Sequence, residues 1–160
     1  GLNIMLDNPG EMGADRVADA VAALAQYPVP LVIIDMGTAT TLSVINRNKQ
    51  YLGGIIMPGV GVSHDSLIAR TAQLPKIALE PPKHVIGKNT IDCMKSGLLF
   101  GTACSLDGLI DRIQAELGEP CTVVATGGLA TVIVPLCKHP MILDDDLLLK
   151  GLMILYHRNQ

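Results

Sequence analysis

The sequence has 160 residues, of which 49% are apolar, and its formal net charge is −3. This length fits one domain with a sizeable core, and the apolar content argues against a disordered chain. Aromatic residues make up only 2% of the chain and the net charge is acidic, so we expect no nucleic-acid partner, because nucleic acid is bound by basic patches and stacked aromatic rings.

The cysteines and the apolar segments predict a cytoplasmic protein. The four cysteines at positions 93, 104, 121 and 137 form no C-x-x-C pair, so we expect reduced thiols and no zinc site. No apolar run reaches the length of about 18 residues that a membrane span needs, and the first residues lack the features of a signal peptide. The chain starts without Met in a strand-like segment, so we expect that it begins in mid-protein.

The first part of the chain predicts one helix followed by three strands. Apolar residues recur at helical spacing in residues 13–27, and two prolines end this helix. The continuous apolar run 31–35 predicts a buried strand, and residues 39–46 and 51–59 predict two further strands. Because short turns join the three strands, they are predicted to form an antiparallel meander.

The second part alternates helices with strands. The spacing and the Gly and Pro positions predict helices over 60–74, 90–118, 127–139 and 146–159, strands over 121–126 and within 141–145, and a surface loop over 75–89. The order β-β-β-α-α-β-α-β-α, with a mixed sheet flanked by helices, resembles the α/β ribonuclease-H-like fold. This unit also forms each half of the actin, sugar-kinase and heat-shock ATPase superfamily, but a fold alone implies no function.

The segment from Asp35 to Thr41 is the first candidate site. A carboxylate ends a buried strand, Gly37 permits a tight turn, and the hydroxyls of Thr38 and its neighbours follow. Carboxylate oxygens suit a hard cation, while backbone N–H groups and hydroxyls suit phosphate oxygens. An ordinary β-hairpin with Asp and Gly in its turn explains the same residues.

The second candidate site lies at the start of the first helix, at Gly13, Ala14, Asp15 and Arg16. Asp15 could take a proton from a substrate hydroxyl, and the guanidinium of Arg16 could hold an anionic substrate or a phosphoryl group. The alternative is structural, because Asp in a first helical turn is favoured by the helix dipole.

Two further glycine-rich motifs and one threonine remain ambiguous. Gly127 and Gly128 follow a strand, where backbone could approach a nucleotide or where a tight turn needs glycine. The pair at 53–54 lies inside a strand and predicts close approach of backbone or ligand. Thr90 begins a helix, where Thr is commonly just an N-cap.

Other patterns predict packing rather than chemistry. Small residues at 97, 101, 105 and 108 form one face of the long helix, which we expect to pack against a neighbour within the chain or across a dimer. The aspartates at 144–146 are interpreted as a solvated turn before the last helix. The four histidines do not cluster and carry no predicted role.

Taken in order, the motifs resemble the type III pantothenate kinases over nearly the whole chain. The matching motifs are GADR (13–16), D-x-G-T-A-T-T (35–41), GG-x-I-x-PG (53–59), LP (74–75), IG-x-N-T (86–90) with SG (96–97), TGG (126–128) and GL (151–152). Each motif is weak alone, but so many in the family's order form a strong signal. The family transfers the γ-phosphoryl group of ATP to pantothenate, the first step of coenzyme A synthesis.

The resemblance implies a role for each candidate residue. Asp15 would be the general base, and Gly13, Ala14 and Arg16 would bind pantothenate together with Thr90, which the family supplies from the partner subunit of a dimer. Asp35 would hold a monovalent cation, K⁺ or NH₄⁺, and Thr38 would contact ATP, which carries Mg²⁺. Gly37, Gly127 and Gly128 are predicted to line the nucleotide site.

Two departures from the family pattern limit the prediction. Ser43 stands where the family usually has Asp, which removes a polar contact or weakens a cation or nucleotide site. The family's N-terminal half, with its D-x-G-N-T phosphate-binding loop, is absent, so residues 1–160 are interpreted as the C-terminal half of a two-domain kinase. We expect this piece alone to be inactive, because phosphoryl transfer depends on positioning and electrostatics.

Two other functions remain open. One is a non-catalytic accessory factor of a transcriptional regulator, a label that some members of the family received. The other is a different small-molecule kinase of the same superfamily, against which GADR and its 20-residue offset to Asp35 argue.

Overall fold

The computed structural model describes residues 2–160, which contain one six-stranded mixed sheet with the order β1-β4-β3-β2-β5-β6. The strands are β1 (Asn3–Ile4), β2 (Leu31–Met36), β3 (Ala39–Ile45), β4 (Gln50–Pro58), β5 (Thr122–Thr126) and β6 (Ile142–Leu143). β2, β3 and β4 form the predicted antiparallel meander, and β5 and β6 continue the sheet in parallel with β2. The predicted α/β fold with a mixed sheet is therefore confirmed.

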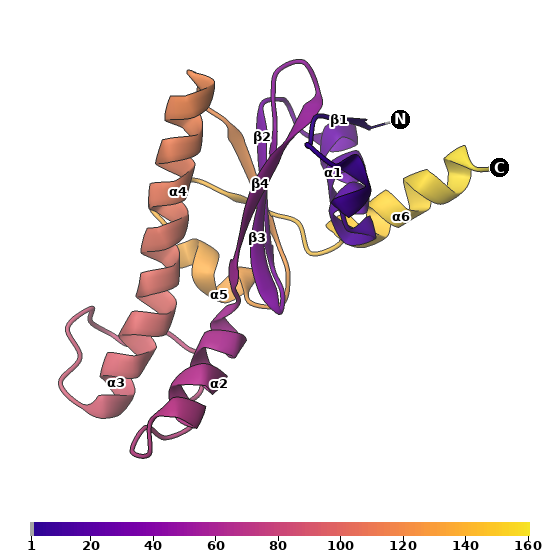
Figure 1. The fold of residues 1–160 in the computed structure, drawn as a ribbon. Helices are drawn as coiled ribbons and strands as arrows, with labels where there is room; N and C mark the ends of the chain where they lie inside the picture. The colour runs from indigo at the N-terminus through magenta and orange to yellow at the C-terminus, as the bar shows by residue number, and fades with distance from the viewer. Residues whose placement is uncertain (1) are drawn as a thin grey trace.

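Helices cover both faces of the sheet. They are α1 (Ala14–Gln26), α2 (Val60–Arg70), α3 (Thr90–Lys95), α4 (Gly101–Leu117), α5 (Ala130–Ile133) and α6 (Leu147–Arg158). α1 and α6 lie on one side of the sheet, α4 and α5 lie on the other, and α2 and α3 extend past one end of it (Figure 1). Among the described residues, no helix combines the length and the apolar composition that crossing a membrane requires.

The apolar run of β2 is continuous because both faces of this central strand are buried. Val32 and Ile34 face the core beneath α4, whereas Leu31 and Ile33 face the core beneath α1. All four side chains are at most 2% exposed. The central strand thus holds both helical layers in place and leads directly to Asp35 at its end.

α1 and α6 pack together through a glycine. A Cβ atom at Gly151 would lie 1.9 Å from the carbonyl oxygen of Ala18. This distance is far below any van der Waals contact, so only glycine lets the two helix backbones approach this closely. The contact fixes α1, and with it Asp15, relative to the C-terminal helix.

The long helix predicted over 90–118 is continuous but not uniform. A π-helical turn over Ser96–Phe100 separates α3 from α4, and the helix ends at Gly118, whose φ of 75° is left-handed as the prediction of a glycine stop requires. Thr90 is not the N-cap. The side chain of Asn89 accepts the N–H of Asp92 at 2.8 Å and caps the helix instead.

Two predicted helices are shorter than expected. α2 ends at Arg70 rather than at residue 74, because Thr71 is extended and its hydroxyl donates to the carbonyl oxygen of Leu67 at 2.5 Å. The predicted helix over 127–139 is wrong in extent, since only Ala130–Ile133 is α-helical and a 3₁₀ turn, Val134–Leu136, follows. Pro135 lies inside this turn and has no N–H to continue a helical ladder.

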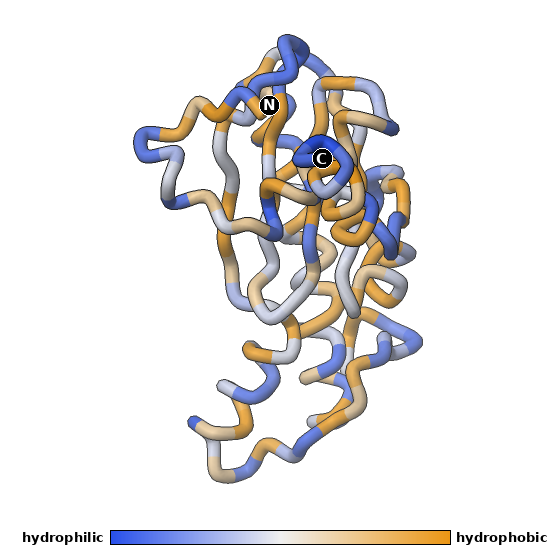
Figure 2. The backbone as a smooth tube through the Cα atoms, turned by 90° about the vertical axis from the view of Figure 1, so that its right-hand side faces the viewer, coloured by the Kyte–Doolittle hydropathy of each residue, from blue (hydrophilic) through white to orange (hydrophobic). Residues whose placement is uncertain are grey.

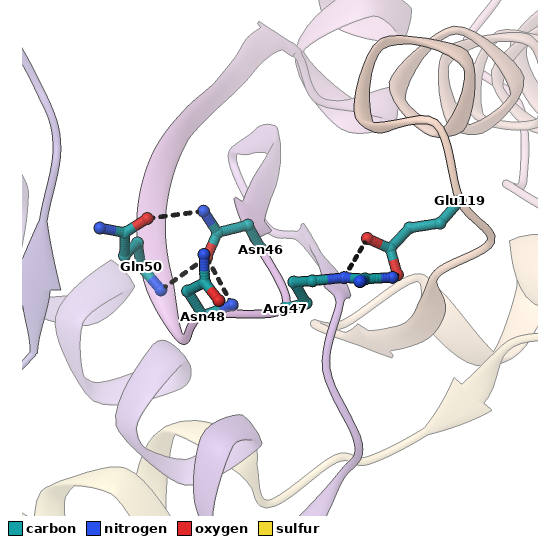
Figure 3. Close-up of polar contacts among 5 residues, drawn as sticks. All are labelled: Asn46, Arg47, Asn48, Gln50 and Glu119. Carbon is teal, nitrogen blue, oxygen red and sulfur yellow. Dashed lines mark hydrogen bonds and ion pairs between the residues drawn. The ribbon is translucent and has the colours of Figure 1, made fainter.

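The β3–β4 hairpin lies at the end of the sheet opposite Asp35, because Ile45 pairs with Leu31 at the start of β2. Figure 3 shows the polar contacts around its turn. The side-chain oxygen of Asn46 accepts the backbone N–H groups of Asn48 and Gln50, each at 3.0 Å. Beside it, Arg47 donates two hydrogen bonds to the carboxylate of Glu119, at 2.8 and 2.9 Å. The Arg47–Glu119 pair thus joins the hairpin to the loop after α4, at the end of the sheet that is remote from Asp35.

Candidate active site

The candidate site lies where β2 and β5 end side by side. The two strands are parallel, and Asp35 of β2 is in register with Thr126 of β5. Because parallel strands place their carboxyl ends at the same edge, the predicted Asp35 and the predicted Gly127 and Gly128 come together there. A cavity of about 450 Å³ opens at this edge and is lined by Asp19, Asp35, Thr126, Gly127, Gly128, Thr131, Asp145 and Leu148.

The backbone at position 127 can be formed only by glycine. Its φ of 102° is a left-handed conformation, and a Cβ atom there would lie 2.6 Å from the backbone of Met36. The expectation that the glycine pair opens a helix is wrong, because α5 starts only at Ala130 and has a single turn. The pair therefore forms a tight turn that brings backbone to the cavity wall.

Asp19 is the site residue that the sequence interpretation missed. It lies four residues after Asp15 on α1, and this spacing places both carboxyl groups on the same side of the helix. Asp19 is 3% exposed, and its Oδ1 atom has no hydrogen-bond partner among the described residues. Burial, and then the charges of Asp35, Asp15 and Asp144, raise the pKa of Asp19 to about 7. The i, i+4 spacing of two aspartates was the signal that could have identified it.

Asp35 shares this acidic environment. It is half-buried, and burial together with the charge of Asp15 raises its pKa above the usual value. Acidic groups so close together favour either a bound proton or a bound cation. The residues present fit a cation at Asp35, because a half-buried carboxylate, the hydroxyl of Thr126 and the unpartnered oxygen of Asp19 are all oxygen donors. Within residues 2–160, no group of three or more His, Cys, Asp or Glu side chains is arranged to hold a metal ion.

The GADR motif forms the first turn of α1. Gly13 is the N-cap residue and makes no side-chain cap, Ala14 and Asp15 are exposed, and Arg16 is partly exposed. Neither Asp15 nor Arg16 belongs to the ion pairs found among residues 2–160. Both charged groups are thus available to a substrate at the edge of the acidic cluster.

The turn between β2 and β3 contains Gly37 and Thr38, both exposed. The carbonyl oxygen of Thr38 accepts the N–H of Gly59 at 3.0 Å, and a Cβ atom at Gly59 would lie 2.2 Å from that oxygen. The end of β4 therefore holds this turn in place. Ser43, which stands where the family usually has Asp, lies in β3 and is buried. Its hydroxyl oxygen lies 2.8 Å from the hydroxyl oxygen of Tyr51, so this residue belongs to the core rather than to the site.

Thr90 is not among the residues that line the cavity at Asp35. It begins α3, which extends past one end of the sheet (Figure 1). A cavity of about 900 Å³ lies beside it and is lined by residues of the 81–92 segment, among them Lys83, Lys88 and Asn89. This cavity is larger than the one at Asp35 but is separate from it.

The interpretation of residues 144–146 as a solvated turn is wrong for Asp144. This residue is 5% exposed, accepts the hydroxyl of Tyr27 at 2.5 Å and accepts Lys150 at 3.0 Å on both carboxylate oxygens. Burial opposes ionisation, but these hydrogen bonds outweigh it and lower the pKa of Asp144. Asp144 therefore joins the end of α1 to α6 as a charged anchor.

The predicted small-residue face runs from Gly97, in the π-helical turn, to Gly101, Ser105 and Gly108 of α4, and all four residues are exposed. A Cβ atom at any of the three glycines would have nothing within 4 Å. Gly97 lines a hollow with residues of α2, but no helix of the described chain packs closely on this face, so the alternative of close packing within the chain is wrong.

The fold and the site define a class of protein. It has a mixed sheet between two helical layers, with carboxyl groups gathered near the ends of its central strands, and solved structures of other proteins share this fold. The structure is similar to a Campylobacter jejuni protein described as a Baf family transcriptional activator, with a TM-score of 0.66 and 22% identity over 94% of this chain and 66% of that one. It also resembles the ethanolamine utilization protein EutJ from Carboxydothermus hydrogenoformans, with a TM-score of 0.51 and 17% identity over 86% of this chain and 50% of that one. Likeness at this level of identity shows the fold alone.

The sequence assigns the family. The model of the type III pantothenate kinase family matches residues 1–112, and the chain belongs to that family. It is 47% identical to the type III pantothenate kinase of Geobacillus sp. strain WCH70 over 99% of this chain. The match spans 62% of that relative's length, so the relative contains a substantial part that this chain does not.

Proposed function

We propose that this chain contributes to the ATP-dependent phosphorylation of pantothenate to 4'-phosphopantothenate, in coenzyme A biosynthesis. One observation carries the proposal for a member of this family. Asp19 and Asp35 line one cavity with Gly127 and Gly128 at the edge of the sheet, and burial together with the nearby charge of Asp15 raises the pKa of both carboxyl groups.

Asp15 is the general base in this proposal. It is exposed at the first turn of α1 and can accept the proton of the substrate's primary hydroxyl. Gly13 and Ala14 leave room beside it, and the Arg16 guanidinium binds the anionic end of pantothenate or the transferring phosphoryl group. The close α1–α6 contact at Gly151 supports this role because it keeps the base in a fixed position.

Asp35 holds a monovalent cation, K⁺ or NH₄⁺, in the same proposal. Its carboxylate supplies oxygen at the cavity, and Thr38 and Gly37 in the adjacent turn contact ATP. Gly127 and Gly128 bring backbone close enough for the nucleotide to lie against it. Mg²⁺ bound to ATP supplies neutralisation of the phosphate charge.

The oligomer and the compartment are part of the proposal. A homodimer would use the uncovered small-residue face of α4 and would bring Thr90 of one subunit toward pantothenate bound at the other. The observation in its favour is that Thr90 begins α3, which extends past one end of the sheet (Figure 1), and does not line the cavity at Asp35. All four cysteines are free thiols, which supports a reducing compartment such as the cytoplasm.

We expect the 160-residue chain alone to be inactive. The relative from Geobacillus is longer than the matched region, and the cavity at Asp35 is lined by no Lys or Arg among the described residues. A phosphoryl group needs positive charge or N–H donors around it. The missing donors would come from the second half of a two-domain kinase.

The test measures pantothenate-dependent ADP release and phosphopantothenate formation with ATP, Mg²⁺ and K⁺. In the complete protein, Asp15→Asn should lower kcat at least about 100-fold, because general bases typically contribute that much. Asp65→Asn, an exposed aspartate on α2, is the control and should leave kcat within about twofold. Undiminished turnover of Asp15→Asn would refute the assignment of the base, and turnover by the 160-residue chain alone would refute the need for a second half.

A further inference from the structure

His64 of α2 is a buried polar side chain that the proposed mechanism does not use. It is 4% exposed, and its Nε2 atom accepts the backbone N–H of Ile77 at 3.1 Å. An imidazole nitrogen that accepts a hydrogen bond carries no proton, so the ring is neutral and has its proton on Nδ1. Burying a polar group costs free energy unless the group is paired, so the contact with Ile77 offsets the cost of burying this ring.

Ile77 lies in the long connection between α2 and α3. Residues 71–89 form no helix or strand, and Ile77 is the one buried residue among them. It belongs to the core beneath α4, against which the partly exposed Leu74 and Leu79 also pack. Ile77 is thus the deepest point of the connection, and His64 holds its backbone there.

The later part of the connection is attached to α3 and to the turn that follows it. The ammonium group of Lys95 lies 3.2 Å from the carboxylate of Glu80, and the hydroxyl of Ser96 donates to the carbonyl oxygen of Val85. Among the described residues, the contact between His64 and Ile77 is the one hydrogen bond that joins α2 to residues 72–89. His64 therefore links α2 to the segment that leads into α3.

The two helices on either side of the connection do not pack tightly on each other. α2 and α3 border a hollow of about 480 Å³, to which α2 contributes Val62 and Ser66 and α3 contributes Cys93 and Met94. α3 also extends past the end of the sheet, and a π-helical turn separates it from α4 (Figure 1, and Figure 2 for the view turned by 90°). The position of the start of α3 therefore depends in part on the connection before it.

We propose that His64 is a positioning residue, which holds residues 75–89 on α2 and thereby sets the place of Thr90 at the start of α3. The anchoring itself stands on the contact between His64 and Ile77. Its consequence for the substrate rests on the proposed function, in which Thr90 contacts pantothenate. Without the imidazole, the N–H of Ile77 would be buried without an acceptor, so the connection would open instead of staying in place.

The experiment uses the complete protein with three single substitutions. His64→Leu keeps an apolar side chain at this site but offers no acceptor, whereas the side-chain oxygen of His64→Gln can accept the N–H of Ile77 in place of Nε2. Thr71→Val is the matched control, because it removes the hydrogen bond that Thr71 donates to Leu67 within the end of the same helix. Circular dichroism and thermal denaturation check that all three variants keep the fold.

Amide hydrogen exchange is the first readout. His64→Leu should speed the exchange of Ile77 and its neighbours in residues 75–89 at least about tenfold, because their protection depends on one anchoring hydrogen bond. His64→Gln should keep this exchange within about threefold of the wild type, and Thr71→Val should leave it unchanged.

Steady-state kinetics give the second readout. His64→Leu should raise the KM for pantothenate at least about fivefold and leave the KM for ATP within about twofold, because Thr90 contacts pantothenate and not the nucleotide. A loss of stability alone would lower the amount of active enzyme without separating the two KM values. His64→Gln should restore the KM for pantothenate.

Unchanged exchange of residues 75–89 in His64→Leu would overturn the anchoring, and equal effects of His64→Leu and His64→Gln would overturn it as well. Faster exchange with an unchanged KM for pantothenate would overturn the link to Thr90. A complete protein that forms no phosphopantothenate would refute the proposed function, while the exchange measurements would still decide whether His64 anchors the connection.

Discussion

Replacing Asp19 by Asn should change how the stability of this protein depends on pH. Asp19 is 3% exposed on α1, and its pKa is raised from 3.8 to about 7 by burial and by Asp35, Asp15 and Asp144. The unfolded chain releases this proton near pH 3.8 and the folded chain near pH 7, so the folded state binds more protons between these values. The free energy of unfolding therefore falls as pH rises from about 4 to about 7.

The size of the effect follows from the two pKa values. The difference between 3.8 and about 7, at about 1.4 kcal/mol for each pH unit, corresponds to about 4 kcal/mol. Asn keeps the shape of Asp but cannot ionise. The variant should thus have a stability close to the wild type near pH 4, and should exceed it by up to about 4 kcal/mol above pH 7.

Urea unfolding at a series of pH values from 4 to 8 measures this difference. Asp65→Asn, at an exposed position of α2, is the matched control substitution. A constant offset for Asp19→Asn over the same range would show that Asp19 ionises freely in the folded protein. That result would refute the acidic cluster as described.

Three further substitutions test the packing that positions the site. Gly151→Ala should destabilise the protein by at least about 1–3 kcal/mol, because the new Cβ atom would lie 1.9 Å from the backbone of α1. Gly61→Ala is the control, since it has open space around it and should stabilise the protein by about 0.5–1 kcal/mol. Thermal denaturation compares the two variants, and equal effects would contradict the close packing at Gly151. Tyr51→Phe should cost about 1–3 kcal/mol in urea unfolding, since it leaves the buried hydroxyl of Ser43 without its partner at 2.8 Å, and an unchanged midpoint would show that the bond contributes nothing. Asn46→Ala should cost about 1 kcal/mol or more by removing three hydrogen bonds within the hairpin turn, two accepted by the side-chain oxygen and one donated to Gln50. Faster amide exchange confined to that turn is the expected signature.

Local patterns predicted most of the fold. The apolar run at 31–35 and the β-branched segment after it became β2 and β3, because strand formation follows from side-chain pattern and turn residues within a few positions. Gly118 ended its helix as expected, since a left-handed residue there depends only on local backbone. The helix after β5 was predicted too long, because Pro135 and the left-handed Gly127 limit it from both ends.

The site was predictable only where its residues stand in motifs. The GADR and D-x-G-T-A segments predict Asp15 and Asp35 as site residues from their order along the chain, and these roles stay predictions. The structure adds that Asp35 ends beside Thr126 and Gly127, because β2 and β5 are parallel neighbours. Asp19 and Asp144 could not be recognised as buried groups from their neighbours in sequence. Their burial arises from α1 and α6 packing over the sheet, which is a contact between segments more than 100 residues apart.

The sequence by itself determined the family, the order of the secondary-structure elements and the motif residues, because these depend on residue types at short spacing. Only the tertiary structure decided which acids share one environment, that Ser43 belongs to the core, and that Thr90 does not line the cavity at Asp35. It also decided that the buried His64 accepts the backbone N–H of Ile77. Burial, pKa and the free surface of a helix are set by which elements pack together, and that packing depends on long-range contacts that no local pattern encodes.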